Sequence, residues 1–176
     1  MAMNPMLDAL HAPAPNPALA DKLSLYGQFV GSWDIDVDYQ IPGGPRLQAP
    51  AEWHFAWGLE GAIIQDVWIC PTRRFRVGKP AEPWHRYGTT LRRYDPTIDA
   101  WHIAYFDPLR AFEIRQIGRA AGNEIVQMQV GDHNGVLRRW RFLDIAKDTF
   151  RWLGEISWDR GGNWTFELEM QARRQS

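Results

Sequence analysis

The sequence predicts an all-β domain: an antiparallel up-and-down β-barrel of about ten strands, with a short N-terminal helix closing one end. Three observations lead to this prediction. Beyond residue 30, apolar and polar residues alternate with the period of two that is typical of half-buried strands. Turn signals rich in Gly, Pro, Asp and Asn separate these segments at regular intervals. The first and last segments each have an unprotected apolar face, and closing the sheet would pair these two edges.

Length and composition agree with one domain. The chain has 176 residues, of which 45% are hydrophobic and 23% charged, and its formal net charge is -1. A chain of this size buries about 70% of its unfolded surface, so its core needs no metal or disulfide. Because the net charge is close to zero, the protein has no strong electrostatic field to attract nucleic acid or anionic lipid. No apolar run approaches the roughly 18 residues of a membrane span. We therefore expect neither nucleic acid nor a membrane among the partners.

The N-terminal region divides into a tail and a helix. Residues 1–17 contain four prolines and neither Lys nor Arg, which predicts a flexible tail without an export signal and hence a cytoplasmic protein. In the next segment, Leu19, Leu23 and Tyr26 form one apolar stripe at helical spacing, and Gly27 suits the helix end. We expect the barrel domain to cover residues 18–176.

Ten segments have the pattern of strands. Turns such as Asp95–Asp99 and Asp159–Gly162 separate the later ones. The third segment is apolar on both faces, with Ile63 next to Ile64. A longer loop, 71–86, follows it, carries a cluster of basic residues and is the natural lid of a barrel mouth. The expected strands are 33–39, 51–57, 62–70, 87–94, 100–106, 111–118, 124–130, 136–145, 149–158 and 163–173.

The segment Phe29-Val30-Gly31-Ser32-Trp33 stands between the predicted helix and the first strand. It resembles the Gly-x-Trp signature of the lipocalin-like calycin superfamily. In that superfamily the Trp closes the barrel floor and a basic residue from the last strand lies over its ring. An even strand number returns the last strand to the start of the first. Arg173 or Arg174 would then make a cation–π contact with Trp33, within about 6 Å.

A second segment, Gly88-Thr89-Thr90-Leu91-Arg92-Arg93-Tyr94-Asp95-Pro96, is followed by Trp101. It is similar to a group of bacterial lipocalin-like domains of unknown function, and the resemblance covers residues 25–174. Nitrobindin-type barrels are more distantly similar and bind haem through a histidine late in the chain. The last histidine here, His133, belongs to a Gly-Asp-His-Asn-Gly turn. We therefore expect no haem.

The interior face is the most informative part of the sequence. If Trp33 points inward, alternation brings aromatic, Gln and Arg side chains inside, whereas Asp66, Arg92 and Glu167 point outward. A packed core avoids unpaired charges, but a ligand cavity combines aromatic walls with a few polar groups. We expect a cavity of a few hundred Å³ or more, with Arg93 and Arg138 as polar anchors unless bulges turn them to water. The candidate ligand-binding residues are Trp53, Arg93, Tyr105, Gln127, Arg138, Trp140 and Trp152.

These features favour binding of a small hydrophobic or aromatic molecule with an acidic or carbonyl group. The alternative is an enzyme, an isomerase, cyclase or hydrolase, that uses the same cavity for proton transfer. The predicted interior contains no carboxylate or histidine, which favours binding, and no catalytic residue is identified. No histidine pair has metal-ligand spacing, so neither a metal nor a cofactor is expected. A third hypothesis is a homodimer formed through an outer apolar face, made of Ile64, Trp68, Val126 and Met128.

Overall fold

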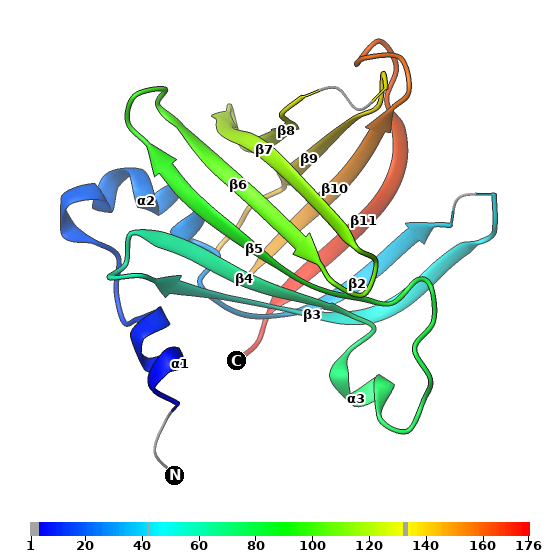
Figure 1. The fold of residues 1–176 in the computed structure, drawn as a ribbon, viewed down its shortest axis with the longest axis horizontal. Helices are drawn as coiled ribbons and strands as arrows, with labels where there is room; N and C mark the ends of the chain where they lie inside the picture. The colour runs from blue at the N-terminus through cyan, green and yellow to red at the C-terminus, as the bar shows by residue number, and fades with distance from the viewer. Residues whose placement is uncertain (1–3, 42, 132–133) are drawn as a thin grey trace.

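The computed structural model describes residues 4–41, 43–131 and 134–176. Ten strands of this part, β2 to β11, form a closed antiparallel barrel (Figure 1). No helix in the described ranges is long and apolar enough to cross a membrane. The helical segments are α1 (Pro5–Leu10), η1 (Pro17–Leu19), α2 (Ala20–Gly27) and α3 (Arg73–Arg76). The strands are β1 (His11–Ala12), β2 (Gly31–Gln40), β3 (Arg46–Gly58), β4 (Ile63–Cys70), β5 (Arg86–Asp95), β6 (Ala100–Asp107), β7 (Phe112–Ala121), β8 (Glu124–Gln129), β9 (Leu137–Leu143), β10 (Thr149–Ser157) and β11 (Thr165–Arg174).

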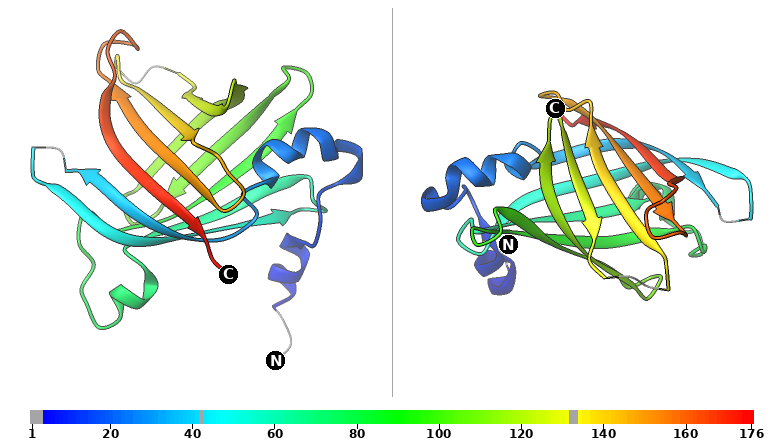
Figure 2. Two further views of the ribbon diagram at one scale, coloured as in Figure 1. Left: turned by 180° about the vertical axis from the view of Figure 1, so that it is seen from behind. Right: turned by 90° about the horizontal axis from the view of Figure 1, so that it is seen from above.

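The barrel closes as the sequence predicts. Each strand from β2 to β11 pairs with the next, and β11 pairs back with β2, where Leu168 lies opposite Tyr39 and Arg174 opposite Trp33. Figures 1 and 2 show α2 at one end of the barrel and the β2–β3 turn and α3 toward the other end. We call the end with α2 the floor and the opposite end the mouth.

Trp33 closes the floor. Its side chain is buried, and its Nε1 donates a 2.7 Å hydrogen bond to the carbonyl oxygen of Phe29. The guanidinium of Arg174 lies 4.1 Å from the centre of the Trp33 ring. Arg174 also donates hydrogen bonds to the carbonyl oxygens of Val30 and Gln28. The predicted cation–π contact is confirmed, and it joins the last strand to the start of the first.

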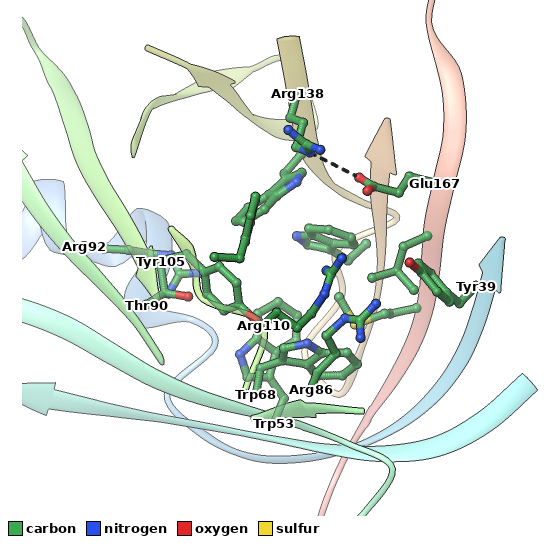
Figure 3. Close-up of a pocket in the computed structure, with 15 residues that line it drawn as sticks. Tyr39, Trp53, Trp68, Arg86, Thr90, Arg92, Tyr105, Arg110, Arg138 and Glu167 are labelled. Atoms are coloured by element: carbon green, nitrogen blue, oxygen red, sulfur yellow. Dashed lines mark ion pairs between the residues drawn. The ribbon is translucent and has the colours of Figure 1, made fainter. Parts of the chain in front are cut away.

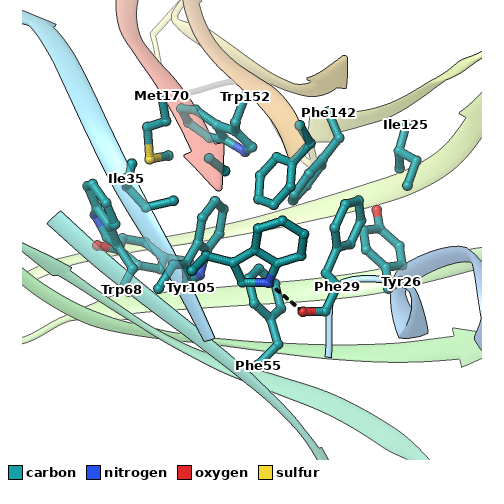
Figure 4. Close-up of a cluster of buried hydrophobic side chains, with 14 of the residues drawn as sticks. Tyr26, Phe29, Ile35, Phe55, Trp68, Tyr105, Ile125, Phe142, Trp152 and Met170 are labelled. Atoms are coloured by element: carbon teal, nitrogen blue, oxygen red, sulfur yellow. Dashed lines mark hydrogen bonds between the residues drawn. The ribbon is translucent and has the colours of Figure 1, made fainter. Parts of the chain in front are cut away.

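Aromatic packing fills the floor half of the interior (Figure 4). The rings of Phe29 and Phe142 stack with centroids 4.6 Å apart, and Tyr26 meets Trp101 edge-on at 4.8 Å. Leu23 and Tyr26 are fully buried, so α2 turns its predicted apolar stripe into the barrel. Each such aromatic pair contributes about 0.5–1.5 kcal/mol beyond the burial of its area.

The N-terminal segment differs from the prediction of a flexible tail over residues 1–17. Its described part, from residue 4, contains α1, β1 and η1, and β1 pairs with Trp57 and Gly58 of β3. The reason is that β2 pairs with β3 only as far as Phe55, so the last residues of β3 leave an edge for β1. Gly61 has a φ of +74°, and a Cβ there would collide with the carbonyl of Ala14, so the turn after β3 requires glycine.

Strands β4 and β5 turn the opposite face inward from the one predicted. Trp53 lies opposite Trp68 and Phe55 opposite Asp66, so odd-numbered residues of β3 share a face with even-numbered residues of β4. The turn 59–62 produces this change of parity. Because β4 is apolar on both faces, the alternation of its residues could not show which face points inward. As a correction, Asp66, Trp68 and Ile64 on β4 and Arg92 on β5 point into the barrel. Ile64 and Trp68 therefore do not belong to an outer dimer face.

Candidate functional site

A cavity of about 110 Å³ lies inside the mouth half of the barrel (Figure 3). It is smaller than the few hundred Å³ predicted, because four arginines and several aromatic rings extend into the same space. The cavity combines aromatic walls with charged groups, as ligand sites do. Its lining residues are Tyr39, Trp53, Trp68, Arg86, Thr90, Arg92, Tyr105, Arg110, Phe112, Arg138, Trp140, Trp152, Glu167, Leu168 and Met170.

Aromatic rings from opposite sides of the barrel form the walls. Trp140 lies 5.4 Å from Trp152 and 5.6 Å from Tyr105, measured between ring centroids. Gly88 of β5 allows this arrangement, because a Cβ at that position would lie 2.5 Å from the Tyr105 ring. The glycine of the Gly-Thr-Thr-Leu-Arg-Arg-Tyr segment therefore makes room for one wall of the cavity.

Three arginines surround the mouth end of the cavity. Arg86 begins β5, Arg110 lies in the connection after β6, and Arg138 lies on β9. The guanidinium of Arg86 lies 5.0 Å from the centre of the Tyr39 ring and donates to the carbonyl oxygen of His85. Burial lowers the pKa of Arg86, and the positive charge of Arg110 lowers it further. Positive charge is therefore concentrated at one end of an aromatic cavity.

These arginines have little anionic compensation. Within the described ranges, neither Arg86 nor Arg110 forms an ion pair, and Arg138 forms one with Glu167 at 3.9 Å. By contrast, Arg139 on the outer face of β9 holds Glu155 with two hydrogen bonds of 2.8 and 3.0 Å. The cavity mouth is therefore suited to an external anion.

Glu167 reaches the cavity because of a β-bulge in β11. Gly154 pairs with Leu168 and Glu155 pairs with Phe166, so Glu167 has no partner across the sheet. A bulge inserts one extra residue and redirects side chains, and it places Glu167 in the lining together with Leu168. Alternation had predicted that Glu167 points outward. That prediction is wrong because a period of two cannot register an inserted residue.

The deep end of the cavity contains a buried ion pair. The guanidinium of Arg92 contacts the carboxylate of Asp66, and both side chains are almost completely buried. The Arg92 guanidinium carbon lies 5.3 Å from the centre of the Tyr26 ring and 5.4 Å from that of Phe55. An uncompensated charge at this depth would be very costly, so the two groups depend on each other.

The prediction of an interior without carboxylates is therefore wrong, but each interior carboxylate has a protein partner. Asp66 pairs with Arg92, and Glu167 with Arg138. Asp107 accepts hydrogen bonds from the Tyr105 hydroxyl at 3.3 Å and from a backbone N–H at 3.1 Å. Burial and the charge of Asp107 raise the pKa of Tyr105, so this phenol remains protonated and acts as a donor.

Five of the seven predicted ligand-binding residues line the cavity: Trp53, Tyr105, Arg138, Trp140 and Trp152. The other two do not line it. Arg93 is exposed and lies 3.4 Å from Asp95, because β5 has the opposite phase. Gln127 does point inward, but it lies near the floor, where its Nε2 donates to the hydroxyl of Tyr26 at 3.0 Å.

Sequence reasoning missed five polar lining residues: Arg86, Thr90, Arg92, Arg110 and Glu167. Three of them, Arg86, Thr90 and Arg92, share the reversed phase of β5. Arg110 belongs to a short connection, where no periodicity indicates the direction of a side chain. A signal for Arg86 was present, since it ends the basic cluster of loop 71–86, but that cluster suggested a solvated loop.

Metal and thiol chemistry have no support in this geometry. Across the part of the chain that the structure describes, no three His, Cys, Asp or Glu side chains are arranged to hold a metal ion. His133, considered above for haem, lies outside the described residues. Burial raises the pKa of the Cys70 thiol to about 12, which leaves it unreactive near neutral pH.

Comparison with known proteins identifies the fold. The chain is similar to the crystal structure of Rv2717c from M. tuberculosis, with a TM-score of 0.60 and 15% identity over 94% of this chain and 99% of that one. It is also similar to the S-type phycobiliprotein lyase CPES from Guillardia theta, with a TM-score of 0.54 and 9% identity over 87% and 92% of the two chains. No family model and no curated protein matches the sequence.

The chain shares the fold of these two proteins, and its own sheet is a closed antiparallel β-barrel of ten strands. The expectation drawn from Gly31-Ser32-Trp33 is confirmed at the level of the fold. The more distant resemblance to nitrobindin-type barrels is not confirmed. At such low identity the similarity extends to the fold alone, and function must be argued from the cavity of this chain.

Proposed function

We propose that the barrel binds a small aromatic molecule with an acidic group, its ring between the aromatic walls and its acid at the mouth. One observation carries the proposal. Three guanidinium groups, from Arg86, Arg110 and Arg138, line one end of an aromatic cavity, and among the described residues Glu167 contributes the one carboxylate of the lining. An anion entering with the ligand would balance this charge.

The chemistry of the lining supports such a ligand at both ends. Planar rings gain about 0.5–1.5 kcal/mol per aromatic pair beyond burial, and Tyr105, Trp140 and Trp152 offer several such faces. Guanidinium groups donate paired, charge-assisted hydrogen bonds to a carboxylate. Arg110 is exposed at the rim and Arg86 is buried behind it, so the acid would meet positive charge at two depths.

Binding is favoured over the enzyme alternative by the state of the interior groups. Proton transfer needs a group that can act as a base near neutral pH. Tyr105 has a raised pKa, and Asp66 and Asp107 are held by Arg92 and Tyr105. These three groups have the character of fixed donors and charges rather than of a general base, and the further carboxylate of the lining, Glu167, faces the cationic Arg138.

The test is a calorimetric titration with two probes of the same shape, 3-phenylpropionate and the neutral 3-phenylpropionamide. The acid should bind more tightly than the amide. Arg110→Ala should weaken binding of the acid by about 1.5–3 kcal/mol, the scale of a hydrogen bond between charged groups, and leave the amide nearly unchanged.

Arg115→Ala is the matched control, because it removes the same charge from an exposed position on the outer face of β7. It should change neither affinity. If both probes bind equally, or if Arg110→Ala and Arg115→Ala have equal effects, then the mouth does not recognise an acid and the proposal fails.

A further inference from the structure

Glu167 is an unusual residue in a cavity proposed to attract anions. Its side chain is 26% exposed and faces Arg138 at 3.9 Å, beyond hydrogen-bond distance. Within residues 4–41, 43–131 and 134–176, its carboxylate accepts no hydrogen bond. Carboxylates of the outer face have much closer partners: Glu155 accepts two hydrogen bonds from Arg139 and Glu124 accepts three from Arg141, all at 2.7 to 3.0 Å.

The backbone directs this carboxylate into the cavity. Regular alternation along β11 would turn Glu167 to water, as it turns Glu169, which pairs with Arg151 on the outer face. The bulge opposite Gly154 and Glu155 instead places Glu167 in the lining (Figure 3). Bulges are frequent beside functional sites, where they redirect a side chain.

A carboxylate that only neutralised the arginines would be expected to form close bonds with them. Arg138 offers several N–H donors, yet the contact remains long, while the Arg138 guanidinium packs 5.3 Å from the centre of the Phe112 ring. Glu167 therefore keeps its acceptor capacity directed at the cavity. A ligand would satisfy this carboxylate with a hydrogen-bond donor, and a positively charged donor would form the strongest such bond.

We infer that the ligand is amphoteric: an aromatic compound with a carboxylate and an adjacent ammonium group, of the chemical class of an aromatic α-amino acid. Its carboxylate meets the arginines at the mouth, and its ammonium donates to Glu167. This inference rests on the proposed function, since it assigns a second polar contact to the same ligand in the same cavity.

Two probes that differ by one ammonium group test the inference: L-phenylalanine and 3-phenylpropionate. Their affinities are compared by calorimetry in the wild-type protein and in Glu167→Gln, which keeps the shape of the side chain and removes its charge. The wild type should prefer L-phenylalanine. Glu167→Gln should weaken L-phenylalanine about tenfold or more, and should leave 3-phenylpropionate unchanged or tighter, because one negative charge has left the mouth.

Glu169→Gln is the control, because it makes the same change two residues away on the outer face of β11. It should alter neither affinity, and circular dichroism should show both variants folded. Equal tightening of both probes in Glu167→Gln would mean that Glu167 is only a counter-ion, and weaker wild-type binding of L-phenylalanine than of 3-phenylpropionate would also overturn the inference. If 3-phenylpropionate itself fails to bind, the proposed function fails first, which keeps the two failures distinct.

Discussion

The two ends of this barrel are built from similar residues and differ in how their polar groups are used. At the floor, the Trp33 indole donates to Phe29, and Arg174 covers its ring while donating to three carbonyl oxygens. At the mouth, Arg86, Arg110 and Arg138 face a cavity, and the carboxylate of Glu167 in its lining lies 3.9 Å from Arg138. An arginine beside aromatic rings therefore stabilises the fold at one end and remains available for a ligand at the other.

The two ends also differ in how densely they are packed. The floor is closed by α2 and by close aromatic contacts, such as Trp33 with Phe150 at 4.7 Å. Interiors packed to this density tolerate little change of volume. The mouth carries the longer connections and retains an open volume of about 110 Å³. Stability should therefore depend on the floor and binding on the mouth, and the predictions below test this division.

The largest effect is expected for Trp33→Ala. The change removes a fully buried indole, its hydrogen bond to Phe29 and its contact with Arg174, so the free energy of unfolding should fall by at least about 3–5 kcal/mol. Urea denaturation measures this loss. Arg110→Ala at the mouth, an exposed change, should stay within about 0.5 kcal/mol of the wild type. Similar losses for the two variants would break the proposed division between the ends.

A comparable loss of unfolding free energy is expected when the buried ion pair of Arg92 and Asp66 is broken, and a second substitution should reverse it. Arg92→Met leaves Asp66 buried without its partner and should cost about 3–5 kcal/mol of unfolding free energy. The double variant Asp66→Leu with Arg92→Met should recover most of this loss, because replacing a buried ion pair by apolar side chains is often neutral or stabilising. Additive losses in the double variant would show that each residue stabilises the barrel independently of its partner.

The sequence predicted the floor well because its signals are local. The alternation of β2, the apolar stripe of α2 and the parity of an even strand number together placed Arg174 over Trp33 without any knowledge of the sheet register. From β6 to β10 the predicted inward face also matches the structure, as Tyr105, Gln127, Trp140 and Trp152 show. In β8 alternation alone did not set the phase, because Val126 and Met128 lie on the outward face and Gln127 and Gln129 on the inward face.

The site was harder to predict because its polar residues depend on irregularities. The change of parity at turn 59–62 reversed β4 and β5, which exchanged Arg93 for Arg92 in the interior. One extra residue in β11 brought Glu167 inside. Arg110 reaches the cavity because of the path of the connection between β6 and β7, where no periodicity applies. Each is a non-periodic event, and periodicity was the main evidence that the sequence offered.

The most direct test of the account is a nuclear magnetic resonance titration that follows the indole N–H signals of the tryptophans as 3-phenylpropionate is added. The signals of Trp53, Trp68, Trp140 and Trp152 should shift together and saturate with one affinity, because these residues line the mouth cavity. The signal of Trp33, bonded to Phe29 at the floor, should remain in place. Shifts centred on Trp33, or shifts confined to the exposed Trp158, would contradict the claim that this barrel binds aromatic acids in the cavity at its mouth.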